Sequence, residues 1–168
     1  MSKIINSIVK ALHSKPFPGA RIFVLSCDED KAFCNQLNEG LRNLGYKYWD
    51  EESCVLPGQN SIMEMERAIF DSEFVLVVMS DMSSRDEGLY QKLLHKVLEE
   101  QAAKSDGGIK LISIFIDETE LPWAFRKYHP LDMTEPENAK MIARSFDTEL
   151  KRRQAKKIPL KKSIAIWI

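Results

Sequence analysis

The chain has 168 residues, of which 44% are apolar and 29% are charged, as expected for one globular domain. Its 24 basic and 25 acidic residues nearly cancel, which excludes a uniformly basic nucleic-acid-binding chain and a uniformly acidic disordered one. No run of about 18 apolar residues occurs, so the sequence predicts no complete transmembrane helix.

Strands and helices are predicted to alternate along the chain. Residues 1–18 are predicted to be a helical extension, a short amphipathic helix that Pro16, Pro18 and Gly19 separate from the first strand. Apolar runs typical of strands buried on both faces occupy residues 20–26, 74–80 and 110–117, and shorter strands are predicted at 46–50 and 131–133. Apolar residues spaced three and four apart predict helices at 33–44, 62–69, 89–98 and 136–154. This alternation is the signature of a doubly wound α/β sheet with helices on both faces.

Two polar segments between these elements carry local signals. Asp28, Glu29 and Asp30 follow the first strand and are predicted to cap the next helix. Pro57-Gly58 lies within the polar segment 51–61 and predicts a type II turn.

The charge is distributed unevenly. Residues 1–150 hold 17 basic and 25 acidic residues, a net charge of −8, whereas residues 151–168 hold seven basic residues and no acidic one. We therefore expect a domain at 19–154 and a basic tail at 155–168, ending in the apolar sequence SIAIWI. Such a tail is expected either to link to a further domain in a longer chain or to contact an anionic membrane.

The cysteines favour a reducing, cytoplasmic setting. Cys27, Cys34 and Cys54 are odd in number and lack paired spacing, so they are predicted to be free thiols, with Cys34 buried. No CxxC or HxxxH pair is present, so no structural metal site is predicted.

Several enzyme classes have no support in the motifs. No GxGxxG or GxxxxGK[ST] follows a strand, and no GxSxG is present. A phosphorelay receiver would use Asp28, Asp30 and Asp81, but no Lys follows the last strand at the required place, and capping is the simpler role for these acids. The histidines and tryptophans fit surface or packing positions better than catalytic ones.

Three segments of the chain stand out in order: RIFVLSCDEDKAF, then GYKYWDEESCVLPGQNSIMEMERAIFDSEFVLVVMS, then ELPWAFRKYHPLDMT. Together they resemble the TIR (Toll/interleukin-1 receptor) domain family, over about residues 19–152. The first resembles the family's first box, the second its strand, BB loop, helix and central strand, and the third the segment before its last helix. The resemblance implies a flavodoxin-like fold of five parallel strands in the order 2-1-3-4-5.

The resemblance also implies two functions. TIR domains assemble with one another through surfaces that include the BB loop, here Val55, Leu56, Pro57, Gly58 and Gln59. Either the apolar tip is exposed for binding, or Leu56 packs into the domain's own core.

Many TIR domains also cleave NAD⁺ with a Glu in an SxWxxxE pattern. In an ungapped alignment from Ser80 this Glu falls at Lys92, and in an alignment shifted by one residue it falls at Leu93. Neither side chain can stabilise the positive charge that develops on the ribose. The nearest carboxylates, Glu87 and Glu99, lie about one turn too early and two turns too late.

The sequence therefore predicts a cytoplasmic TIR module of innate immune or defence signalling that acts by homotypic assembly, without a cofactor. A TIR-type NAD⁺ hydrolase with a displaced carboxylate is the alternative. A vestigial nucleotide pocket is expected to be bordered by Ser26, Cys27, Asp28 and Trp123.

Overall fold

The structure is a computed structural model that describes residues 2–13, 19–103, 108–159 and 163–168. Five strands are present in these ranges: β1 (Arg21–Leu25), β2 (Lys47–Tyr48), β3 (Phe74–Met79), β4 (Lys110–Phe115) and β5 (Leu131–Asp132). The longer helices are α1 (Lys3–His13), α2 (Lys31–Asn43), α4 (Ser61–Asp71), α6 (Leu89–Ala102) and α8 (Ala139–Ala155). Single helical turns form η1 (Asp28–Asp30), α3 (Glu51–Cys54), α5 (Asp81–Ser84), α7 (Trp123–Arg126) and η2 (Pro136–Asn138).

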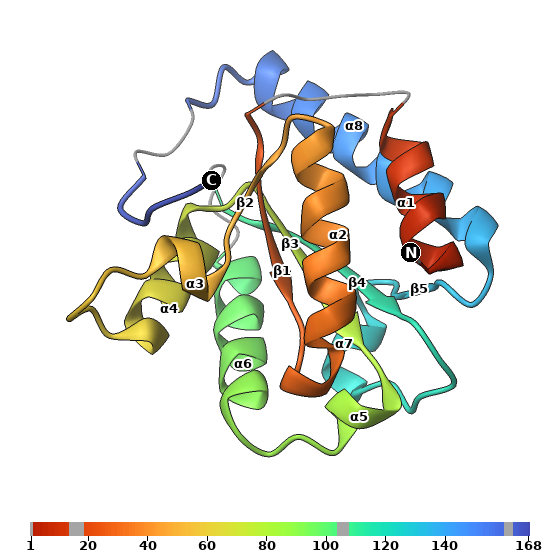
Figure 1. Ribbon diagram of the computed structural model, residues 1–168. Coiled ribbons are helices and arrows are strands. Elements are labelled where there is room, and N and C mark those ends of the chain that lie inside the picture. The colour runs from red at the N-terminus through yellow and green to blue at the C-terminus, as the bar shows by residue number, and fades with distance from the viewer. Residues whose placement is uncertain (1, 14–18, 104–107, 160–162) are drawn as a thin grey trace.

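The strands form one parallel sheet in the order β2-β1-β3-β4-β5, which confirms the predicted topology (Figure 1). β1, β3 and β4 lie in the middle, and almost all their side chains are buried. The predicted apolar runs become these central strands because helices cover both faces of the sheet. β2 and β5, at the two edges, have only two residues each.

One face of the sheet is covered by α1, α2 and α8. Ile5, Ile8 and Leu12 of α1 are fully buried in a core cluster with residues of α2, α8 and the sheet. Gly40 of α2 allows α1 to approach, because a Cβ at this position would lie 2.5 Å from Cγ2 of Val9. The N-terminal helix is thus part of the core packing.

The other face is covered by α4 and α6, with Phe125 of α7 at its margin. Alternate residues of the same strands point to this side, among them Phe23, Val75 and Val77. Trp49 follows β2 and packs against Phe23, with ring centroids 5.5 Å apart, so its predicted role as a packing anchor is confirmed. Together the two clusters form the three-layer core of a doubly wound fold.

The acids after β1 do not cap α2 as predicted. Asp28, Glu29 and Asp30 form the η1 turn, and none of their side chains makes a capping bond to the helix. Asp30 instead accepts hydrogen bonds from Ser80 at the end of β3 and from the Cys27 thiol, 3.2 Å away. The carboxyl ends of neighbouring parallel strands lie side by side, which brings these residues together.

The basic run at 151–162 is only partly solvated. Arg153 is buried; its guanidinium binds Glu149 at 3.0 Å and the carbonyl oxygen of Gly108. Residues 160–162 of this run lie outside the described residues. Residues 163–168, expected to be part of a tail, pack back onto the domain beside β2 (Figure 1). No helix in the described ranges is long and apolar enough to cross a membrane.

Candidate functional site

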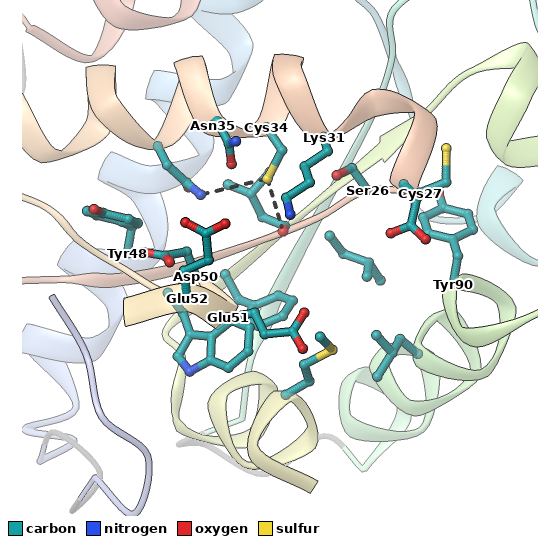
Figure 2. Close-up of a pocket in the computed structure, with 18 of the residues that line it drawn as sticks. Ser26, Cys27, Lys31, Cys34, Asn35, Tyr48, Asp50, Glu51, Glu52 and Tyr90 are labelled. Atoms are coloured by element: carbon teal, nitrogen blue, oxygen red, sulfur yellow. Dashed lines mark hydrogen bonds between the residues drawn. The ribbon is translucent and has the colours of Figure 1, made fainter. Parts of the chain in front are cut away.

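A pocket of about 600 Å³ opens beside the carboxyl ends of β1 and β2. Its walls come from α2, from α3 and the residues before it, and from the start of α6. Figure 2 shows Lys31 and Asn35 projecting from α2 on one side, with Glu51 and Glu52 from α3 across from them. This is the edge of a doubly wound sheet at which ligands usually bind.

The lining of the pocket is acidic. Six carboxylate side chains line it, against the two cationic side chains of Lys31 and Arg42. The carboxylates belong to Asp28, Glu39, Asp50, Glu51, Glu52 and Asp86. Such a lining favours cationic or hydroxyl-rich groups over phosphates, because a second negative charge near these carboxylates is repelled.

Two buried polar atoms belong to residues that line this pocket. Asn38 Oδ1 and Trp49 Nε1 have no hydrogen-bond partner among the described residues. Because a buried polar atom without a partner costs free energy, a ligand or water that bonds to either atom would be held more tightly.

A group of hydrogen-bonded residues includes Cys27 and Tyr90 of the pocket lining. Ser80 caps α5 and donates to Asp30, which also accepts from Cys27. Tyr90 of α6 donates its hydroxyl to the Val78 carbonyl oxygen at 2.8 Å, and burial raises the pKa of this hydroxyl. The Tyr90 bond joins the start of α6 to β3, and the two bonds to Asp30 join the residues that follow β1 to Ser80 after β3.

All three cysteines are free thiols, which confirms the prediction. Burial, with a contribution from Asp30, raises the pKa of the Cys27 thiol to about 12. Burial also raises the pKa values of Cys34 and Cys54. Cys34 is half-buried, more exposed than the buried position expected for it, and it lies with Cys27 in the pocket wall.

These thiols should react slowly with disulfide reagents. A thiol of pKa about 12 is a thiolate in only about one molecule in 10⁴ at pH 8, and the thiolate is the nucleophile. We expect Cys27 to remain unlabelled by an aromatic disulfide in the folded chain, and all three thiols to react after unfolding in guanidinium. A Cys34→Ser variant serves as control for labelling of Cys34, which is the most exposed of the three thiols. Fast labelling of Cys27 at pH 8 would contradict this geometry.

The two positions at which the resemblance places the family's catalytic Glu, Lys92 and Leu93, differ in where they lie. Leu93 points into the pocket lining and is 2% exposed, whereas Lys92 is exposed and does not line the pocket. The register shifted by one is therefore the one that faces the pocket. Glu87 is exposed and does not line the pocket, whereas the carboxylate of its neighbour Asp86 does.

The BB loop, residues 55–59, is a closed turn with an apolar tip. Gly58 has φ +86°, and the Gln59 amide donates to the Leu56 carbonyl oxygen at 3.0 Å, which confirms the type II turn. The Gln59 side chain accepts from the Leu56 amide at 2.7 Å and closes the loop a second time. Leu56 is 51% exposed, so it does not pack into the core. Val55 is half-buried and packs against the core cluster on the α4 and α6 face.

Of the four residues predicted to border the pocket, three line it and one does not. Ser26, Cys27 and Asp28 line the pocket, but Trp123 does not and is 82% exposed. Trp123 begins the single turn α7 beyond β4, away from the β1–β2 end of the sheet, and it is not a packing anchor. Sequence reasoning missed the carboxylates around α3 and Asp86; the acidic run DEE at 50–52, next to a short strand, was the available signal.

No group of three His, Cys, Asp or Glu side chains in the described ranges is arranged to hold a metal ion.

Comparisons with known proteins agree with this geometry. The family model described as "TIR domain" matches residues 22–145. The chain is similar in structure to the TIR domain of the Toll-related receptor TRR-2 from Hydra magnipapillata, with a TM-score of 0.59 and 19% sequence identity. That match covers 77% of this chain and 97% of the Hydra domain. No significant match to a curated protein was found. With the family model covering most of its length and the fold in the same strand order, the chain belongs to the TIR domain family.

Proposed function

We propose that the protein is a cytoplasmic signalling module of innate immunity or defence that assembles with other TIR domains, copies of itself included, through its BB loop. The observation that carries this proposal is the exposed apolar tip of a rigid loop. Leu56 leaves half of its surface in water although the turn beneath it is closed by two hydrogen bonds. Apolar groups held in this way gain free energy when a partner covers them.

The surroundings of the loop support the same role. Asp50 caps α3 before the loop, and Asn60 caps α4 after it, so both ends are anchored. The first turn of α4 adds two further exposed apolar side chains, Ile62 at 38% and Met63 at 51%. An anchored loop loses little conformational entropy on binding, which favours association.

Replacing Pro57 by His should weaken self-association by about tenfold or more without unfolding the domain. Pro57 is exposed and makes the first corner of the turn, so the change alters the tip and spares the core. Binding between a tagged and an untagged copy measures the effect, and circular dichroism checks the fold. Pro136→His, at an exposed proline that starts η2, is the matched control. Equal binding by the Pro57 variant and this control would rule out the loop as the contact.

NAD⁺ hydrolysis is a second candidate because carboxylates do line the pocket. Glu51, Glu52 and Asp86 could take the place of the family Glu if a substrate ribose reached them. Our proposal predicts that no nicotinamide is released when the concentrated protein is incubated with NAD⁺, because Leu93 occupies the pocket-facing position of α6. Nicotinamide release that disappears in a Glu51→Gln variant would replace the proposal by the hydrolase.

A further inference from the structure

The last of residues 163–168 pairs with the edge of the sheet. The amide of Ile168 donates to the Tyr48 carbonyl oxygen at 3.2 Å, and the Tyr48 amide donates to the Ile168 carbonyl oxygen at 3.1 Å. Two residues that exchange both hydrogen bonds are the mark of an antiparallel pair. The C-terminal segment therefore reaches the outer edge of β2 and pairs with it at Tyr48, on what is otherwise the open edge of a parallel sheet (Figure 1).

A buried carboxylate anchors the other end of this segment. Oδ2 of Asp71 accepts from the amides of Ile164 and Ala165 at 2.9 and 2.7 Å, and the Ser163 hydroxyl donates to it at 3.0 Å. Asp71 is 0% exposed and lies at the end of α4. A buried charge is tolerated only where donors surround it, and all the donors shown for Asp71 Oδ2 come from residues 163–165.

The side chains of the segment alternate as in a strand. Ala165 and Trp167 point inward and pack against the core cluster on the α4 and α6 face. Ile164, Ile166 and Ile168 point outward and are 61%, 39% and 36% exposed. One copy of the chain thus leaves a row of three isoleucines in water.

The geometry points to a strand-binding site on the domain, formed by the β2 edge and the Asp71 carboxylate, that takes residues 163–168 of a second copy by strand exchange. The ligand it recognises is an extended segment with a hydroxyl, a small residue and an aromatic residue at alternate positions. A second copy carries this segment with every contact already matched, and exchange of an identical element is a low-cost route to a dimer. A few hydrogen bonds and two inward side chains hold the segment, so its release costs little compared with global unfolding.

Two complementary variants test this site, each made in the Pro57→His background so that contacts of the BB loop do not contribute. Asp71→Ala damages the acceptor and keeps the segment intact; Trp167→Ala damages the segment and keeps the acceptor intact. When the two variants are mixed, the intact segment of the Asp71→Ala chain can enter only the intact site of the Trp167→Ala chain. We expect about tenfold more heterodimer in the mixture than in either variant alone, measured by light scattering after size exclusion.

The control mixture pairs Glu118→Ala with Met141→Ala, two exposed positions away from the site. We expect it to contain no more dimer than either of its two variants alone, because both copies keep an intact site and an intact segment and mixing opens no new pairing. If both test variants are folded by circular dichroism and form no heterodimer, strand exchange is refuted.

A second measurement covers the case in which Asp71→Ala fails to fold. A fluorescent peptide of residues 163–168 is added to the full chain carrying Trp167→Ala, and its anisotropy is followed. We expect saturable binding that is lost when Trp in the peptide is replaced by Ala. Absence of binding by the unchanged peptide would overturn the proposal, whatever the behaviour of the BB loop.

Discussion

Replacing Glu73 by Ala should lower the free energy of unfolding by about 3–5 kcal/mol, since it removes one partner of a buried ion pair. Glu73 and Arg21 are 2% and 6% exposed and stand at the starts of β3 and β1. The carboxylate accepts from the Arg21 amide and from its guanidinium Nη2, both at 2.7 Å. The variant leaves a buried positive charge without this counter-ion. Urea unfolding followed by circular dichroism measures the loss.

An exposed ion pair provides the control for this prediction. Arg85 and Asp81 lie 2.8 Å apart, and their side chains are 72% and 48% exposed. Arg85→Ala should change stability by less than about 1 kcal/mol, because water screens such a pair. A double variant, Arg21→Met with Glu73→Leu, should recover much of the loss by replacing both charges with apolar groups. If Glu73→Ala were as mild as Arg85→Ala, the buried pair would not hold β1 to β3 as described.

Replacing Phe146 by Ala should cost a similar amount, about 3–5 kcal/mol, through a different mechanism. Phe146 of α8 is 1% exposed and stacks on Phe74 of β3, with ring centroids 4.0 Å apart. It also meets the Tyr46 ring edge-on at 6.1 Å. Removal of the ring leaves a cavity between α8 and the sheet, which surrounding groups fill only in part. Thermal or urea unfolding gives the value.

Met141 lies on the same helix as Phe146 and is 42% exposed, so Met141→Ala is the matched control and should have little effect. A loss well below about 2 kcal/mol for Phe146→Ala would mean that α8 is not packed into the core through this ring.

Local patterns predicted the parts of the fold that depend on neighbours in sequence. The apolar runs around Val24, Leu76 and Ile112 predicted buried parallel strands, and their order followed from the family resemblance. Pro57-Gly58 predicted the turn because positive φ at the third position of a type II turn suits glycine.

Local patterns could not predict contacts between residues that are far apart in the sequence. The Asp71 carboxylate meets Ser163 across 92 positions, and Ser80 meets Asp30 across 50. Nothing local at SIAIWI distinguishes a linker from a strand that returns to the sheet edge. Trp123 was misplaced because a single helical turn has no periodicity from which to infer its buried side.

The candidate site was predicted in outline only. Ser26, Cys27 and Asp28 follow from their place at the end of β1, since that end of a parallel sheet carries the binding crevice. Whether Lys92 or Leu93 faces the pocket depends on the rotation of α6 about its axis, which is set by the packing of Tyr90 and Leu94 against the sheet.

The most direct test of the central claim, that the domain acts by assembling with itself, is sedimentation velocity of the unchanged chain over a series of concentrations. We expect the weight-average sedimentation coefficient to rise with concentration, and to rise much less over the same range in a Leu56→Asp variant, in which only strand exchange of residues 163–168 remains. A monomer value for the unchanged chain up to its solubility limit, or an equal rise for the variant, would contradict assembly through the BB loop.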